Sequence, residues 1–360
     1  MRHSIRPSLS LVSCVLLLGA ILTACSGGSP TTSPTTTSMT LNVGQISNAV
    51  GFFPLYVAQQ KNFIKAQGLT LNPSPPLQTG TGAKMTAAIE AGDLEVAGGG
   101  IITDAFTLSR IDAQVRLLGA LTTGYFVDVV VSKRFEQQTH LTEASPLADK
   151  VKALVGKKLG ITAPGSGTES LFVYLFRQFG FDEQRDATAV NLGNVNPAVA
   201  IAALSSGRVD AVAFPVPTGQ VAEAKGVGDI FISPDHGDVP EMVGQLHGVI
   251  YARQQVIDAK PKAIQAFIRA IAQAEAFIHQ QPAQAKILLQ KYLKLDPKTA
   301  QAVFTATMSI MAQTPQISQK DYDVANQFHV KAGLIAIALP YKDVVATNTI
   351  NQALSGMSNS

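Results

Sequence analysis

The chain has 360 residues, of which 46% are hydrophobic and 15% are charged, and a formal net charge of +3. Arg2 and Arg6 precede an apolar segment that we expect to be removed, which leaves about +1 without a run of like charges and argues against a nucleic-acid partner. Cysteine occurs only at positions 14 and 25, so the rest of the chain has no disulfide framework, cysteine zinc site or cysteine nucleophile. The length favours two lobes.

The first 24 residues have the pattern of a secretory signal. Two arginines without an acidic residue precede an almost wholly apolar stretch at residues 11–22, which is shorter than a typical membrane span. The sequence LTAC that ends at Cys25 resembles the lipobox of bacterial lipoproteins. We therefore expect a lipoprotein signal peptide over residues 1–24 and lipidation of Cys25. The alternative is an ordinary cleaved signal followed by a chance cysteine.

Residues 25–38 are mostly Ser, Thr, Gly and Pro, which bury too little surface to offset the entropy of the chain. We expect a lipid-anchored flexible tether here, and a folded part that begins near Met39. No later run is long and apolar enough to span a bilayer. This organisation predicts an extracytoplasmic protein that is anchored to the cell membrane.

Strands alternate with helices through residues 39–124, the first predicted lobe. Alternating or β-branched apolar residues predict strands, and apolar residues at helical spacing predict helices. The predicted strands are 41–46, 69–72, 94–97 and 115–121, and the predicted helices are 53–67, 83–91 and 102–109. Such an alternation is typical of a sheet with parallel strands flanked by helices.

A second α/β series runs through residues 125–247, the second predicted lobe, after a polar stretch at 137–149. Its predicted strands are 158–162, 189–192, 209–214 and 229–232, and its predicted helices are 168–179, 197–206 and 216–224. The chain is expected to cross between the lobes near 127–131 and 248–251. Residues 248–360 then hold a return strand and C-terminal helices that pack partly on the first lobe; predicted helices include 282–292, 297–311, 320–333 and 341–353.

Several segments are similar to extracytoplasmic solute-binding proteins of the SsuA-like kind, which serve ABC importers of sulfonates, taurine, nitrate and thiamine-precursor pyrimidines. LNVGQISNAVGFFPLYVA, from Leu41, has the family's order of strand, polar loop and helix start. AAIEAGDLEVA at 87–97, the segment 201–210 and the turn at 160–168 resemble three further family motifs. The resemblance covers residues 41 to about 289. It implies a two-lobed α/β fold of the type II periplasmic-binding-protein kind with a helical C-terminal part, and a small-molecule ligand in the cleft.

The segment APGSGTES at 163–170 is the best candidate for an anion site. It follows a predicted strand and opens a helix, where free N–H groups and the helix dipole favour an anion, and Gly165 and Gly167 allow close approach. Ser166 and Thr168 would add hydroxyl donors, or would only cap the helix. Glu169 would oppose a dianion.

Two further loops of the first lobe are candidates for ligand contact. Thr79, Thr81 and Gly82 precede a helix and offer hydroxyl and N–H donors, although Thr81 could simply cap that helix. Gly99 and Gly100 follow a predicted strand, where they could let a ligand contact the backbone or only permit a tight turn.

The family resemblance implies ligand contact in the loop after the first strand, at Ser47, Asn48 and Phe52, whose ring could stack on a heterocycle. Pro215 lies in a stiff turn of the second lobe, and Tyr125 lies at the first predicted crossing. Asp128, also at this crossing, could pair with an amine, or it could be an ordinary surface acid. The histidines, including His247, have no metal-ligand spacing, so we predict neither a metal nor a cofactor.

The sequence thus predicts a monomeric substrate-binding lipoprotein that captures a small organic anion, such as a sulfonate, taurine or nitrate, and delivers it to an ABC permease with its ATPase. The scarcity of basic residues in the candidate loops favours a monoanion or a neutral ring over a phosphate-rich compound. A thiamine-precursor pyrimidine as the ligand, or a membrane-tethered sensor with this fold, are the alternatives. We expect no enzyme, because the chain lacks catalytic motifs and the cysteine-bearing motifs of enzymes of this fold.

Overall fold

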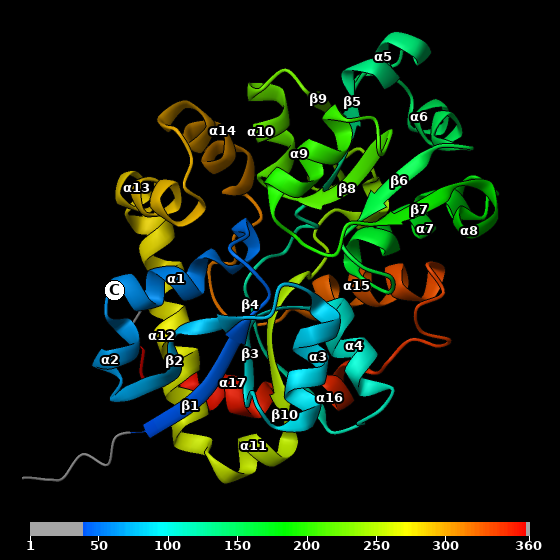
Figure 1. Cartoon of the computed structure of the whole chain (residues 1–360). Coiled ribbons are helices and arrows are strands. Elements are labelled where there is room, and N and C mark those ends of the chain that lie inside the picture. Colours follow the sequence, from blue (N-terminus) through cyan, green and yellow to red (C-terminus); the bar gives the residue numbers. More distant parts are fainter. Residues whose placement is uncertain (1–38, 358–360) are drawn as a thin grey trace, which may run out of the picture. The chain divides into compact units, whose positions relative to one another are not determined.

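Two five-stranded sheets form the framework of the computed structural model, which describes residues 39–357 (Figure 1). The first sheet has the order β2-β1-β3-β10-β4, with β1 (Met39–Gln45), β2 (Leu69–Gln78), β3 (Val96–Ile101), β4 (Val115–Ala120) and β10 (Gly248–Arg253). The second has the order β7-β6-β8-β5-β9, with β5 (Val127–Ser132), β6 (Lys158–Ile161), β7 (Thr188–Asn191), β8 (Ala211–Pro215) and β9 (Gly228–Ile232). The predicted mixed α/β class is confirmed.

Both sheets contain parallel and antiparallel strand pairs, and the arrangement is the same in the two sheets. Strand β1 is parallel to β2 and β3, and β6 is parallel to β7 and β8. The strand that follows each crossing is antiparallel to both neighbours: β5 lies between β8 and β9, and β10 lies between β3 and β4. The predicted crossings at 127–131 and 248–251 are therefore wrong, because these residues are internal strands. The chain crosses just before them, at 121–126 and 233–247.

Helices cover these sheets. On the first lobe they are η1 (Val50–Phe52), α1 (Phe53–Gln60), α2 (Phe63–Ala66), α3 (Gly82–Ala91) and α4 (Ile102–Ser109). On the second they are α5 (Lys133–Thr139), α6 (Leu147–Leu154), α7 (Gly167–Gln178), α8 (Glu183–Asp186), α9 (Pro197–Ser205) and α10 (Thr218–Ala224). The second crossing contains the short helices η2 (Pro234–His236) and η3 (Pro240–Met242). The C-terminal part holds α11 (Gln254–Ala259), α12 (Pro261–Gln280), α13 (Pro282–Leu293), α14 (Pro297–Thr307), α15 (Gln319–Lys331), α16 (Tyr341–Val344) and α17 (Thr347–Leu354).

Several predicted elements have different limits. The predicted helix at 53–67 breaks at Asn62, which adopts a left-handed conformation that asparagine tolerates. The predicted strand at 69–72 continues to Gln78 despite three prolines, because β2 is an edge strand and can lack ladder donors. The polar stretch at 137–149 is partly helical, in α5 and α6. The predicted helix at 341–353 is interrupted where Val345 pairs with Leu117 of β4.

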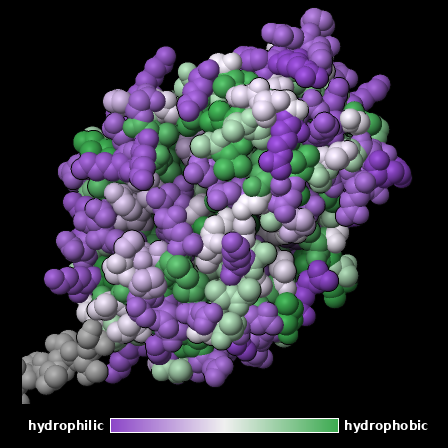
Figure 2. Space-filling view, viewed as in Figure 1, coloured by the Kyte–Doolittle hydropathy of each residue, from purple (hydrophilic) through white to green (hydrophobic). Residues whose placement is uncertain are grey.

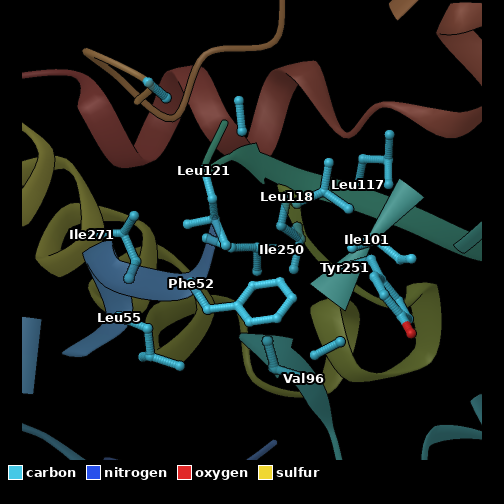
Figure 3. Close-up of a cluster of buried hydrophobic side chains, with 14 of the residues drawn as sticks. Phe52, Leu55, Val96, Ile101, Leu117, Leu118, Leu121, Ile250, Tyr251 and Ile271 are labelled. Carbon is cyan, nitrogen blue, oxygen red and sulfur yellow. The ribbon is translucent and has the colours of Figure 1, made fainter. Parts of the chain in front are cut away.

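The main core lies between the first sheet and helix α12. This helix starts with Pro261 and buries eleven residues along its length, and it packs on α1, α2 and α17. Figure 3 shows Phe52 within this core, among Val96 of β3, Ile250 of β10 and Leu121, which follows β4. On the face shown in Figure 2, hydrophobic residues form small separate groups among hydrophilic ones. None of the helices within residues 39–357 has the length and hydrophobicity that a membrane span requires.

Helix α15 attaches to both lobes. Phe328 and Ala332 are buried in the core of the second lobe, where the Phe328 ring lies 5.0 Å from that of Tyr174 on α7. The next residue, His329, bonds through Nε2 to the Thr103 hydroxyl of α4 in the first lobe, at 2.8 Å. Figure 1 shows α15 beside α7 and close to α4. The C-terminal helices therefore contact both lobes, and α14 likewise contacts α10.

Candidate functional site

A cavity lies where the two lobes meet, and residues from both lobes line it. Its volume is ≈ 40 Å³, well below the roughly 300–1,000 Å³ of small-molecule pockets, so little empty space remains between the lobes in this conformation. The first lobe contributes Ile46, Ser47, Phe52, Gly82, Ile101 and Asp104. The crossings and the second lobe contribute Phe126, Val127, Thr162, Ser166, Gly167, Thr168, Val195, Pro215 and His247. The strand ends and helix starts predicted from the sequence thus meet at one place.

Half of the residues predicted to contact a ligand line this cavity. They are Ser47, Phe52, Gly82, Ser166, Gly167, Thr168 and Pro215. The others do not line it: Asn48, Thr79, Thr81, Gly99, Gly100, Tyr125 and Gly165. Asn48 instead accepts hydrogen bonds from Gln45 and Gln78, and Thr81 caps α3 by accepting one from the Lys84 N–H. Thr79 donates to the carbonyl of Thr81.

Gly99 and Gly100 are not in a loop after a strand, as predicted, but inside β3. A Cβ at Gly99 would overlap Cβ of Gln45, and one at Gly100 would overlap the ring of Tyr251. These glycines allow neighbouring side chains, rather than a ligand, to press on the backbone. The sequence signal was ambiguous because glycine permits both kinds of close approach.

The N-terminus of α7 is largely satisfied by its own loop. Ser166 caps the helix by accepting from the Glu169 N–H, and the Glu169 carboxylate accepts from the Gly165 N–H at 2.5 Å. The Thr168 hydroxyl lies 2.8 Å from that of Ser166 and accepts from the Thr162 N–H. The protein's own carboxylate therefore occupies part of the predicted anion site. The first two amides of the helix, of Gly167 and Thr168, have no hydrogen-bond acceptor among the described residues.

The aromatic side chains of Tyr125 and His247 pack against the start of helix α7. The Tyr125 hydroxyl donates to the Gly167 carbonyl at 2.5 Å, and the Tyr125 ring lies 4.0 Å from the ring of His247. The space beside the Gly167 Cα is bounded by Ile101, Tyr125 and His247. Tyr125 thus positions the site without lining it. Burial lowers the pKa of His247 to about 3, so its ring is neutral, and its Nδ1 has no hydrogen-bond partner.

Asp104 is an acidic site residue that the sequence analysis did not single out. It lies in the first turn of α4 and is 4% exposed, and its Oδ2 has no hydrogen-bond partner. Burial raises its pKa to about 7. A Cβ at Gly82 would overlap both carboxylate oxygens, so the predicted residue Gly82 makes room for the acid. The available signal was an acid at the start of a helix whose other early residues are apolar, a pattern that also fits a simple first-turn acid.

Asp128, the acid considered for pairing with an amine, is not a surface residue and does not line the cavity. It lies in β5, is 1% exposed, and accepts a hydrogen bond from the Ser233 hydroxyl at 2.7 Å. Burial raises its pKa well above the usual range.

Comparison with known families assigns the chain. A model of the NMT1-like family matches residues 33–292, well over half of the chain. The chain belongs to the NMT1-like family. No curated protein matches this NMT1-like chain significantly in sequence.

Solved structures with low sequence identity share its fold. A structure from Bordetella bronchiseptica RB50 is 22% identical, with a TM-score of 0.73 over 89% of this chain and 98% of the other. The alkanesulfonate-binding protein SsuA from Xanthomonas axonopodis pv. citri, bound to MOPS, is 19% identical, with a TM-score of 0.65 over 85% and 98%. The periplasmic nitrate-binding protein NrtA from Synechocystis PCC 6803 is 14% identical, with a TM-score of 0.67 over 89% and 90%. The predicted periplasmic-binding-protein fold is confirmed.

The cavity of this NMT1-like protein combines an apolar wall with a few polar groups. The rings of Phe52 and Phe126 pack edge to face at 5.7 Å, beside the aliphatic side chains of Ile46, Val127 and Val195. The described lining contains no Lys or Arg. Residues 39–357 also hold no group of three His, Cys, Asp or Glu side chains that could bind a metal ion. The arrangement suits binding of a small, partly apolar molecule.

A larger hollow lies near α15 and α17, with a volume of ≈ 550 Å³, and Met311, Gln313, Asp321 and Asn351 are among its lining residues. None of its described lining residues has a buried side-chain polar atom without a partner. The interlobe cavity, where Asp104 and His247 both have such atoms, is therefore the better candidate.

Proposed function

We propose that this protein is the extracytoplasmic substrate-binding component of an ABC importer, and that it captures a small solute in the interlobe cavity. The observation that carries the proposal is the cavity itself, which is lined by both lobes and contains buried polar atoms without protein partners. Membership of the NMT1-like family, and a fold shared with SsuA and NrtA, support it. A solute that contacts both lobes favours the closed state, which would dock on the permease.

The proposal extends to the membrane. Cys25 carries the lipid, residues 26–38 form the tether, and the protein acts as a monomer without a cofactor or catalytic role. The supporting observation is the order of charged start, apolar stretch and LTAC sequence. These residues lie outside the part that the structure describes.

The binding role is tested by filling the cavity. Val195 lies in a loop that lines it, whereas Val243 is 53% exposed elsewhere, so V195W and V243W are a matched pair. We expect a bound solute to raise the melting temperature of the wild type and of V243W by mass action, but not that of V195W. A shift that V195W retains would place binding elsewhere.

The transport role needs a second readout. In cells that lack the gene, uptake of the same solute should be lost and should be restored by the wild type and V243W, but not by V195W. If the solute binds but its uptake does not depend on the gene, the tethered sensor becomes the better interpretation.

A further inference from the structure

Asp104 has features that point to a missing partner. Its side chain lines the interlobe cavity, is almost fully buried, and has a carboxylate oxygen without a hydrogen bond. A buried polar atom without a partner costs free energy, and native proteins rarely keep one without a role. An acid in this position therefore suggests a group that arrives with the ligand.

No described residue that lines the cavity carries a positive charge to neutralise this carboxylate. The described lining of the cavity has no Lys or Arg, and His247 is neutral because burial lowers its pKa to about 3. The other titratable groups near Asp104 are Tyr125 and Tyr251, whose hydroxyl pKa values its charge helps to raise. His329, bonded to the neighbouring Thr103, is also neutral, because burial lowers its pKa to about 4.

The fold keeps space for the carboxylate. Gly82 is the first residue of α3, and any larger side chain there would overlap the carboxylate of Asp104. The cavity is also lined by the rings of Phe52 and Phe126 and by Gly167 and Thr168 at the start of α7. A ligand can therefore place a donor on Asp104, an apolar body on the rings, and an acceptor at α7.

We propose that the ligand carries an N–H donor, such as an ammonium or amidinium group, that pairs with Asp104 while its apolar part lies against Phe52 and Phe126. This inference rests on the proposed function and narrows it. A sulfonate or nitrate without a nitrogen donor would meet an unneutralised acid and no cation. Taurine remains compatible, because its ammonium group can reach Asp104 while its sulfonate lies at the α7 amides.

The test uses matched compounds that differ in the donor. The full chain is immobilised as wild type, D104N, D93N and V195W, and is exposed to yeast extract supplemented with two pairs: taurine with ethanesulfonate, and benzylamine with benzyl alcohol. Asp93 is exposed and outside the cavity, so D93N controls for the loss of one acid. Retained molecules are identified by mass spectrometry, and their affinities are measured by calorimetry.

Some compounds should be retained by the wild type and D93N but not by V195W, and we expect each of these to carry an N–H donor. The substitution D104N should weaken the binding of these compounds roughly 10- to 100-fold. Affinity should rise from about pH 5.5 to pH 8, because an ionised Asp104 pairs best with a cation. A retained compound without such a donor, or one that D104N binds equally well, would overturn the inference but not the proposed function. If the wild type retains nothing beyond V195W, the proposed function itself fails.

Discussion

At the scale of single residues, the cavity is marked by groups that do not help the folded state. Asp104 and His247 are buried and each has a polar atom without a hydrogen-bond partner. Burial raises the pKa of Asp104 and lowers the pKa of His247, and both shifts favour the neutral form of the side chain. Such sites are costly to stability and are therefore expected where binding requires them. The hydroxyls of Ser166 and Thr168, by contrast, are already bonded to each other. Asp104 is thus more informative about the ligand than the serine and threonine that the sequence suggested.

Asp104 should make stability depend on pH in a definite direction. Its pKa is about 7 in the folded state against 3.8 for an ordinary aspartate, so between these values the folded state keeps a proton that the unfolded state has lost. Its contribution to stability therefore falls as pH rises from about 4 to 7, and stays low above. The neutral, isosteric variant D104N should raise the melting temperature most at about pH 8 and least at about pH 4.

The measurement is thermal unfolding of the wild type, D104N and D93N across this range of pH. Only the difference between variant and wild type is diagnostic, because His247 and His329 act in the opposite sense: burial lowers their pKa values to about 3 and about 4, so the unfolded state gains protons first on acidification. A constant difference between D104N and the wild type, or an equal effect of D93N, would contradict the prediction.

At the scale of elements, helix starts bring the cavity together. Helix α3 begins at Gly82, α4 carries Asp104 in its first turn, and α7 begins at Gly167, so three short regions far apart in sequence meet. The contact between α3 and α4 is tight because glycine stands where a Cβ would overlap the acid. This predicts a direct energetic coupling between Gly82 and Asp104.

A double-mutant cycle measures that coupling. We expect G82A to lower the free energy of unfolding by about 1–3 kcal/mol, because the added methyl group overpacks a buried site. In a D104A background the same change should be neutral or slightly stabilising, because the carboxylate is gone and alanine favours a helix over glycine by up to about 1 kcal/mol. Urea unfolding of the four proteins gives the coupling energy. An equal cost of G82A in both backgrounds would show that the two residues do not interact.

The elements also show what the sequence could and could not predict. Periodicity located most strands and helices, including the helix at 102–109, because local apolar patterns determine them. It placed Gly99 and Gly100 in a loop, and the crossings inside β5 and β10, because pairing with distant strands decides those positions. The same limit applies to the cavity. Loops at helix starts that the sequence singled out contribute residues to the cavity wall, but only the fold shows that the side chain of Asp104 is buried and has an oxygen without a hydrogen bond.

At the scale of the whole molecule, the two lobes are held by more than the two crossings. Phe328 of α15 packs in the second lobe, while the adjacent His329 bonds to Thr103 of the first. Closer to the cavity, the Val50 N–H donates to the carbonyl of Val216 across the lobes at 3.4 Å. The Val50 hydrogen bond and helix α15 therefore both link the two lobes, in addition to the two crossings.

The proposed anchor gives the last prediction, which concerns where the molecule works. A diacylglyceryl group buries methylenes worth about 0.8 kcal/mol each, enough to hold the folded part at the membrane. The full chain should therefore partition into the detergent phase, and C25S should move to the aqueous phase, whereas C14S should behave as the wild type because Cys14 lies inside the predicted signal. C25S should bind solute unchanged yet support less uptake, since tethering raises the effective concentration at the permease. If C25S partitions into the detergent phase like the wild type, Cys25 is not the anchor. If C25S moves to the aqueous phase but still supports full uptake of the solute, the anchor is not needed for delivery.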